Sequence, residues 1–159
     1  MSRELKAIVY LSKATAVTDH LEVEGLVEVA QKANAKHQVT GFIVYQKDHF
    51  LQYIEGSTLA VDQLMKNIRI DKRHQVLTTI TIPISTRKFP DWGMRWNREN
   101  ISIETVLLDY LKALLQPLQI TETQQNNVLR MLNGISGHYR KETPQNHNLW
   151  TGKLLNSSE

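Results

Sequence analysis

The chain of 159 residues contains no cysteine, which excludes disulfide bonds, thiolate nucleophiles and metal sites with cysteine ligands. It also has no apolar run that approaches the roughly 18 residues expected of a membrane-spanning helix. The N-terminus lacks the apolar stretch and the small-residue cleavage site of a signal peptide. From these absences we expect a cytoplasmic protein that is not inserted in a membrane.

Several motifs that usually carry catalysis or nucleotide binding are missing as well. The 7 glycines are dispersed and form neither a G-x-G-x-x-G nor a Walker pattern. The 6 histidines show no H-x-x-x-H or H-E-x-x-H spacing, so we predict no metal site. Ser12 and Ser85 lack the surroundings of a nucleophile elbow.

A strong excess of one charge is also absent. The formal net charge is +3, and the basic residues are scattered along the chain. Nucleic-acid-binding proteins usually cluster their basic residues on one face, so we expect no direct binding to nucleic acid. Hydrophobic residues make up 41% of the chain and charged residues 22%, which is typical of a globular domain with its own core.

Residues 5–97 alternate between strand-like and helix-like patterns. Apolar residues recur at every second position in 5–12, 39–45, 50–56 and 76–84, which predicts strands. Helical spacing follows the capping residues Asp19 and Ser57. A four-residue turn, "QKDH", joins the second and third strands, and "WGMRW" (92–96) predicts a short last strand. The order β-α-β-β-α-β indicates an α+β, ferredoxin-like fold with both helices on one sheet face.

Two further amphipathic helices are predicted after the sheet. The first, ended by Pro117, has an apolar stripe at Ile103, Val106, Leu107, Tyr110, Leu111, Leu114 and Leu115. The second opens at Thr121 and Gln124, which have capping-box spacing, and runs to about Asn133. These helices must pack on the free sheet face, on each other or on another chain. We therefore divide the chain into a sheet domain (1–97), a helical extension (98–135) and a polar, mobile tail (136–159).

Three polar residues lie on faces that are otherwise apolar. Tyr10 shares a strand row with Ser12, Gln52 lies between two apolar residues of the third strand, and Asn34 continues the stripe of the first helix. If Tyr10 and Gln52 point toward the helices, all three meet between sheet and first helix. Buried amides and hydroxyls need hydrogen-bond partners. Either they bind a planar ligand, or each is a half-exposed residue or a core polar group bonded to backbone.

The chain resembles the BLUF family, blue-light sensors that use flavin, over residues 5 to about 97. Five segments in the family's order carry this resemblance: "IVYLS", "AQKANAKHQVTGFIVY", "FLQYIEG", "DKRH" and "DWGM". One departure is Ala33, which stands before Asn34 where some members carry His or Asn.

The resemblance implies a site for non-covalent FAD, with FMN as the alternative, between the two helices. By this resemblance Asn34 would bond the polar edge of the flavin ring, and Arg73 and His74, at the end of the second helix, would contact its pyrimidine side. Gln52 would bridge Tyr10 and the ring.

The remaining family positions are supporting ones. Ser12 would support the pair of Tyr10 and Gln52, and Trp92 or Met94 would lie near Gln52 from the last strand.

The resemblance also implies the activity. Light would drive an electron and a proton from Tyr10 through Gln52, rearranging the hydrogen bonds to the flavin without catalytic turnover. The change would leave through the last strand and the C-terminal helices to a downstream signalling protein or through a homo-oligomer, since no effector domain is expected in residues 98–159. The alternative is a ferredoxin-like binding module or small enzyme without flavin. Arg87 and Lys88 are predicted to be solvated loop charges.

Overall fold

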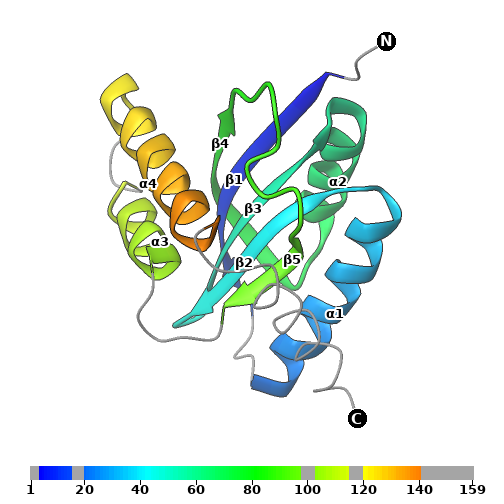
Figure 1. Ribbon diagram of the computed structural model, residues 1–159. Helices are drawn as coiled ribbons and strands as arrows, with labels where there is room; N and C mark the ends of the chain where they lie inside the picture. Colours follow the sequence, from blue (N-terminus) through cyan, green and yellow to red (C-terminus); the bar gives the residue numbers. More distant parts are fainter. Residues whose placement is uncertain (1–3, 16–19, 98–102, 115–119, 141–159) are drawn as a thin grey trace.

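The computed structural model describes residues 4–15, 20–97, 103–114 and 120–140 (Figure 1). The predicted cap Asp19, the predicted helix residues Leu115 and Pro117, and residues 141–159 of the predicted tail lie outside these ranges. The elements in chain order are β1 (Leu5–Ala14), α1 (His20–Lys36), β2 (Thr40–Gln46), β3 (His49–Ser57), α2 (Thr58–Ile70), β4 (His74–Ile82), β5 (Gly93–Asn97), α3 (Ile103–Ala113) and α4 (Glu122–Arg140).

The five strands form one sheet in the order β4-β1-β3-β2-β5. Neighbours are antiparallel except β2 and β5, which are parallel. The first four strands and the first two helices therefore confirm the predicted ferredoxin-like arrangement, with β5 added at one edge.

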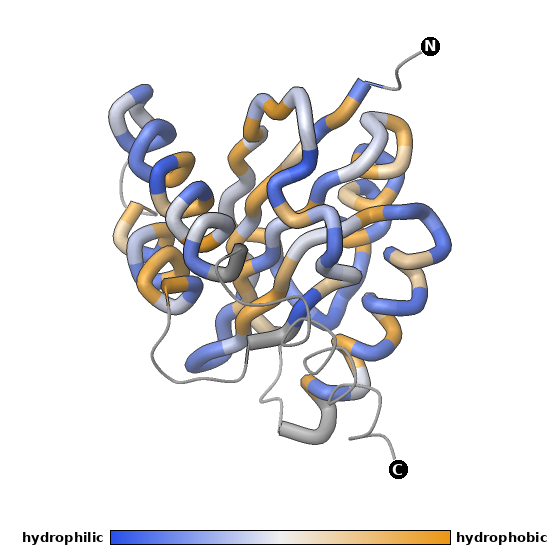
Figure 2. Tube along the Cα trace, in the orientation of Figure 1, coloured by the Kyte–Doolittle hydropathy of each residue, from blue (hydrophilic) through white to orange (hydrophobic). Residues whose placement is uncertain are grey.

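Helices cover both faces of the sheet. Figure 1 places α1 and α2 on one side and α3 and α4 on the other. The alternation of side chains along each strand divides the core into two apolar clusters, one under each helix pair. Hydrophobic and hydrophilic residues alternate along the helices in Figure 2, as expected for helices with one buried side. Of the three packing partners left open for the C-terminal helices, two are observed among the described residues: the free sheet face and the other helix of the pair.

The turn between β2 and β3 is shorter than predicted. Gln46 pairs with His49, so only Lys47 and Asp48 lie in the turn. Their φ angles are 48° and 67°, which is the left-handed conformation that a two-residue hairpin turn of type I′ requires. The four-residue turn predicted from "QKDH" is therefore wrong, because both flanking residues join the strand ladder.

The ends of α2 follow the capping rules. The hydroxyl of Ser57 accepts a hydrogen bond from the backbone N–H of Ala60 at 3.2 Å, which confirms the predicted cap. The helix ends at Ile70, and β4 begins at His74, two residues before the predicted start of that strand. His74 is therefore the first residue of a strand and not the last residue of a helix.

The C-terminal helices differ from the prediction in detail. Thr121 and Gln124 exchange two backbone-to-side-chain hydrogen bonds, at 2.8 and 3.2 Å, which confirms the capping box. In α3, however, Val106 is 54% exposed and Leu108 is buried, so the buried face is rotated from the predicted stripe.

The predicted end of the last helix near Asn133 is wrong, because α4 continues to Arg140. Ile135 and Ser136 are both buried, and this packing outweighs the roughly 1 kcal/mol that a helical Gly134 costs. None of the described helices has the length and apolar character needed to cross a membrane.

Candidate functional site

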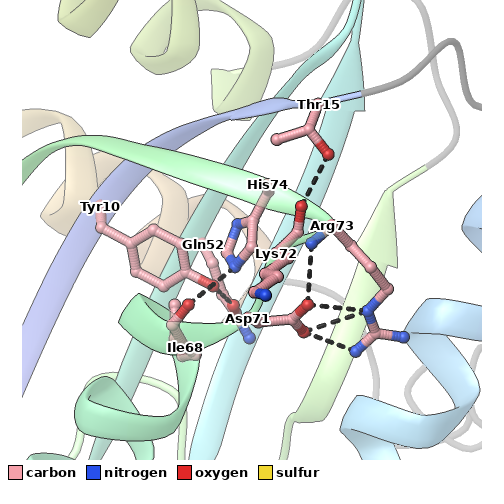
Figure 3. A network of polar contacts seen from close by, with 8 residues as sticks. All are labelled: Tyr10, Thr15, Gln52, Ile68, Asp71, Lys72, Arg73 and His74. Atoms are coloured by element: carbon pink, nitrogen blue, oxygen red, sulfur yellow. Dashed lines mark hydrogen bonds and ion pairs between the residues drawn. The ribbon is translucent and has the colours of Figure 1, made fainter.

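Tyr10 and Gln52 form a buried cross-strand pair. They lie directly opposite each other in the antiparallel ladder of β1 and β3, so their side chains leave the same face of the sheet. Their exposed fractions are 3% and 4%, respectively. The Tyr10 hydroxyl donates a hydrogen bond to Gln52 Oε1 (Figure 3). The two residues predicted to act together are therefore in direct contact, on the face covered by α1 and α2.

The other end of the Gln52 amide contacts Met94. Gln52 Nε2 donates to Met94 Sδ at 3.1 Å. The Met94 carbonyl accepts from Gln31 Nε2, on α1, at 3.0 Å. Both ends of the Gln52 amide thus have partners, a strong one at its oxygen and a weak sulfur acceptor at its nitrogen.

Trp92 lies in the opposite core. Its ring stacks on Phe89 at 4.8 Å between centroids, and the Arg95 guanidinium lies 4.5 Å from its centroid. Two residues that are two positions apart in a strand would share a face. Here Trp92 precedes β5, and Met94 has a φ of 69°, which turns the chain between them. The structure therefore brings Met94, and not Trp92, to Gln52.

A cavity of about 250 Å³ opens beside Tyr10 and Gln52, between α1 and α2. Its floor includes Ile43 and Phe50 from the sheet. Its walls are made by one helix on each side, with Leu26, Val29, Ala30, Ala33 and Asn34 from α1 and Leu64, Asn67 and Ile68 from α2. Apolar walls with a few convergent polar groups are typical of a site for a small organic ligand.

Asn34 lines this cavity from α1 with an unsatisfied donor. Its side chain is 2% exposed, and its Nδ2 has no hydrogen-bond partner among the described residues. A buried donor without a partner costs about 1–3 kcal/mol. A planar ligand with a carbonyl at its edge would satisfy it, as the sequence prediction for Asn34 requires. Ser12 Oγ is buried and likewise has no partner in the described part of the chain, so it forms no hydrogen bond to the Tyr10–Gln52 pair.

The segment after α2 closes one end of the cavity. Arg73 binds Asp71 through two nitrogens, with Nε–Oδ1 and Nη2–Oδ2 distances of 3.0 and 2.6 Å (Figure 3). These hydrogen bonds lower the pKa of Asp71 to about 2. His74 Nε2 donates to the Ile68 carbonyl at 3.0 Å. Thr15, directly after β1, holds this segment in place, because its hydroxyl donates a hydrogen bond to the Lys72 carbonyl at 2.7 Å.

Arg73 and His74 both line the cavity, although the guanidinium of Arg73 is held by Asp71. The ring of His74 lies 6.4 Å from that of Tyr10, between centroids.

The Tyr10 phenol is held in its neutral form. Burial raises the pKa of Tyr10 far above its ordinary value of 10.0, and the nearby Asp71 carboxylate raises it further. A neutral phenol that donates to an amide is both an electron donor and a proton donor along a formed hydrogen bond. The arrangement of Tyr10, Gln52 and the cavity therefore suits the transfer of an electron and a proton next to a bound ligand.

Three residues at the site were not found from the sequence. Asn67 faces the cavity three positions after Leu64, so the rule that found Asn34 could have found it as well. Asp71 belongs to the "DKRH" segment but was not assigned a role. Gln31 carried no sequence signal, because its partner is a backbone carbonyl 63 residues away.

Comparison with known proteins shows which family the chain belongs to. Residues 5–95 match the family described as "BLUF: Sensors of blue-light using FAD". The photoactivated adenylate cyclase subunit beta of Euglena gracilis is 30% identical over 122 residues, which is 75% of this chain and 14% of that protein. The chain thus spans about a seventh of the length of these curated relatives.

Two solved structures share both sequence and fold with the chain. The dark-state structure of BlrB, a BLUF protein, is 27% identical with a TM-score of 0.59, covering 84% of this chain and 98% of that one. A bacterial light-regulated adenylyl cyclase is 28% identical with a TM-score of 0.58, covering 79% and 36%, respectively. The family match covers more than half of the chain, including Tyr10, Gln52, Asn34 and the cavity between α1 and α2. This chain therefore belongs to the BLUF family, the sensors of blue light that use FAD.

Proposed function

We propose that Tyr10 and Gln52 are the photoactive pair of this blue-light sensor, and that the cavity between α1 and α2 holds the flavin ring of FAD. The observation that carries the proposal is the hydrogen bond from the buried Tyr10 hydroxyl to Gln52 Oε1 at the floor of that cavity. When bound there, FAD supplies a chromophore that absorbs blue light and becomes a strong oxidant.

Different side chains in the cavity wall would contact different parts of the flavin ring. Aliphatic side chains of α1 and α2 would enclose its faces and exclude water. Asn34 Nδ2, the unsatisfied donor, would bind a carbonyl at the edge of the ring. Asn67 lines the opposite wall, and Arg73 and His74 lie at the end of the cavity near the C-terminus of α2.

Tyr10 and Gln52 would then act in sequence. When Tyr10 loses an electron to the photoexcited flavin, its phenol becomes strongly acidic, and the proton can pass along the existing hydrogen bond to Gln52 Oε1. When the electron and proton return to Tyr10, Gln52 is left with its donor and acceptor ends facing different partners. No covalent bond has formed, so the dark arrangement returns thermally.

A change in the orientation of Gln52 would first affect Met94, because Gln52 Nε2 donates a hydrogen bond to Met94 Sδ. Met94 lies on β5, the edge strand that precedes α3 in the chain. We propose that the sensor (1–97) signals through β5 and the helices that follow it.

The receiver of the signal would be a separate protein or a second copy of the chain, and the chain itself would not be an enzyme. The relatives named as photoactivated cyclases support a downstream effector, since the matched region is only a small part of each.

A single preparation tests this function. The chain should be purified, its cofactor released and identified by chromatography, and its absorption recorded before and after blue light. We expect FAD and a reversible red shift of the flavin absorption. Protein that stays colourless when FAD and FMN are supplied would instead support the alternative, a ferredoxin-like binding module or small enzyme without flavin.

A further inference from the structure

Glu55, near the end of β3, is a fully buried carboxylate that the light reaction does not use. Its Oε2 accepts hydrogen bonds from the Tyr53 hydroxyl at 2.8 Å and from the Lys88 backbone N–H at 2.9 Å. Its Oε1 accepts from the Phe89 backbone N–H at 2.7 Å and from the Thr40 hydroxyl at 3.3 Å. Two successive backbone groups of the loop between β4 and β5 are thus fixed to β3 by one ionised side chain, and bonds to a charged acceptor are the stronger kind.

Arg87 adds a second attachment of the same loop. Its Nη1 donates to the Thr40 hydroxyl at 2.9 Å and to the Glu55 carbonyl at 3.2 Å, and its Nη2 donates to the Gln38 carbonyl at 2.7 Å. The prediction that Arg87 is a solvated loop charge is therefore wrong, whereas the ammonium group of Lys88 bonds Asn133 at the exposed surface. Carbonyl and hydroxyl acceptors on β2, on β3 and before β2 carry no sequence pattern that would have indicated these partners.

The same loop segment, 87–89, also holds α4. The Ser136 hydroxyl donates to the Lys88 carbonyl at 2.9 Å, and Lys88 Nζ donates to Asn133 Oδ1 at 2.5 Å. Ser136 is buried, so its hydrogen bond is shielded from water. The segment is therefore joined to the sheet on one side and to the last helix on the other.

A series of hydrogen bonds joins this segment to the light-sensitive pair. Gln52 Nε2 donates to Met94 Sδ, and the Met94 N–H donates to the Trp92 carbonyl at 2.7 Å. The Trp92 N–H donates to the Phe89 carbonyl at 3.3 Å, and the Phe89 N–H donates to Glu55. Gln52 and Glu55 lie on the same strand, so both ends of this series are fixed to β3.

We propose that Glu55 is a positioning residue that locks segment 87–89 to β3, so that a change at Gln52 and Met94 moves α4. This inference rests on the proposed function, because it requires light to change the hydrogen bonds of Gln52. A loop held by two charge-assisted bonds cannot shift independently of its partners, so a displacement of Met94 moves segment 87–89 and, with it, α4. A loop without these two bonds can change its own conformation when Met94 moves, and α4 then keeps its dark position.

The test is hydrogen exchange of the α4 backbone in the FAD-loaded full chain, in the dark and under blue light. The flavin red shift is recorded in the same samples. In Glu55→Gln, an amide NH₂ faces one of the two loop N–H groups, and that bond is lost. We expect the variant to keep the red shift and to lose the light-dependent difference in α4 exchange.

Two further variants complete the design. Ser136→Ala removes the bond from α4 to the loop and should reduce the light-dependent difference even if Glu55→Gln does not fold. Asn127→Ala is the matched control. It removes a bond from α4 to the Tyr110 hydroxyl, 3.0 Å long, outside the loop, and should keep the full difference.

The outcomes separate the claims. An absent red shift in the unmodified chain would overturn the proposed function and this inference with it. A red shift without any light-dependent exchange in α4 would overturn the inference alone. It would also be overturned if Glu55→Gln and Ser136→Ala raised α4 exchange equally in dark and light, with the difference between the two conditions preserved, because Glu55 would then only stabilise the fold.

Discussion

The Tyr10 hydroxyl donates to Gln52 Oε1 while Gln52 Nε2 donates to Met94 Sδ, so one amide separates a phenol from a thioether. The phenol is a strong partner and the sulfur a weak one. An exchange of the two ends of the amide therefore has a small cost on the Met94 side. This asymmetry suits Gln52 to a change of orientation.

Asn34→Ala should weaken FAD binding. The substitution removes the buried N–H that has no partner among the described residues, and a lost hydrogen bond of this kind is worth about 1–3 kcal/mol, or roughly a 5- to 150-fold rise in Kd. Titration of the apoprotein with FAD, followed by flavin fluorescence, measures it. Asn126→Ala, at an exposed position of α4, is the control and should leave the Kd unchanged. Equal affinities for both variants would remove Asn34 from the site.

Met94 and Trp92 should respond differently to substitution. Met94→Leu keeps the size of the side chain but removes the sulfur acceptor of Gln52, so we expect a shifted dark spectrum and a changed rate of dark recovery. Trp92→Phe should leave the dark spectrum unchanged, because its ring packs on Phe89 in the opposite core. Dark absorption spectra of the two variants and the unmodified chain test this expectation. A spectrum that responds to Trp92→Phe and ignores Met94→Leu would contradict the placement of both residues.

Gly41→Ala should destabilise the fold strongly. Gly41 has a φ of 150°, and a Cβ at this position would lie 1.8 Å from the Tyr53 carbonyl oxygen. Since that oxygen is backbone, the strands themselves must separate, and we expect a loss of more than about 2 kcal/mol in the free energy of unfolding. Gly25→Ala, at an exposed position of α1 with open space around it, should instead be neutral or stabilising by up to about 1 kcal/mol. Chemical denaturation of the two variants gives both numbers, and a Gly41→Ala variant as stable as the parent would contradict the strand geometry.

Alkaline pH should destabilise the chain through its buried phenols. Burial raises the pKa of Tyr10, and burial together with Glu55 raises that of Tyr53, both above the ordinary value of 10.0. The folded state therefore holds these protons more tightly than the unfolded state. The resulting stability is fully present below pH 10 and is lost above it, by up to about 1.4 kcal/mol per pH unit for each phenol.

Denaturation at several pH values above 10 tests this expectation. Tyr10→Phe should have a shallower fall of stability with pH than the unmodified chain. Ultraviolet absorption should also find the two phenols protonated at pH 11 while the chain is folded. Phenolate formation at all five tyrosines below that pH, without unfolding, would disagree with the buried environment.

Strand geometry singled out Tyr10 and Gln52 as polar residues in apolar rows, and the resemblance to the BLUF family paired them. Side chains alternate with period two, so each residue could be assigned to one row of its strand, but only the structure shows that both rows face the helices α1 and α2. Asn34 followed in the same way from helical periodicity. The order of the first six elements, and hence the ferredoxin-like fold, came from these two periods together with the capping residues.

Other features depended on interactions that periodicity does not carry. The left-handed backbone at Met94 settles which of Met94 and Trp92 lies near Gln52, and nothing in "DWGM" indicates it. The buried face of α3, with Leu108 inside and Val106 outside, is set by its docking on the sheet. Arg87 bonds mainly backbone carbonyls of residues distant in sequence, which no local pattern can reveal.

The central claim is that Tyr10 delivers the electron and proton that rearrange Gln52. The most direct measurement is the light-minus-dark absorption spectrum of the FAD-loaded chain beside that of Tyr10→Phe, which keeps the ring and removes only the hydroxyl. We expect a reversible red shift in the unmodified chain and, in Tyr10→Phe, bound FAD with no red shift. A normal, reversible red shift in Tyr10→Phe would contradict the account.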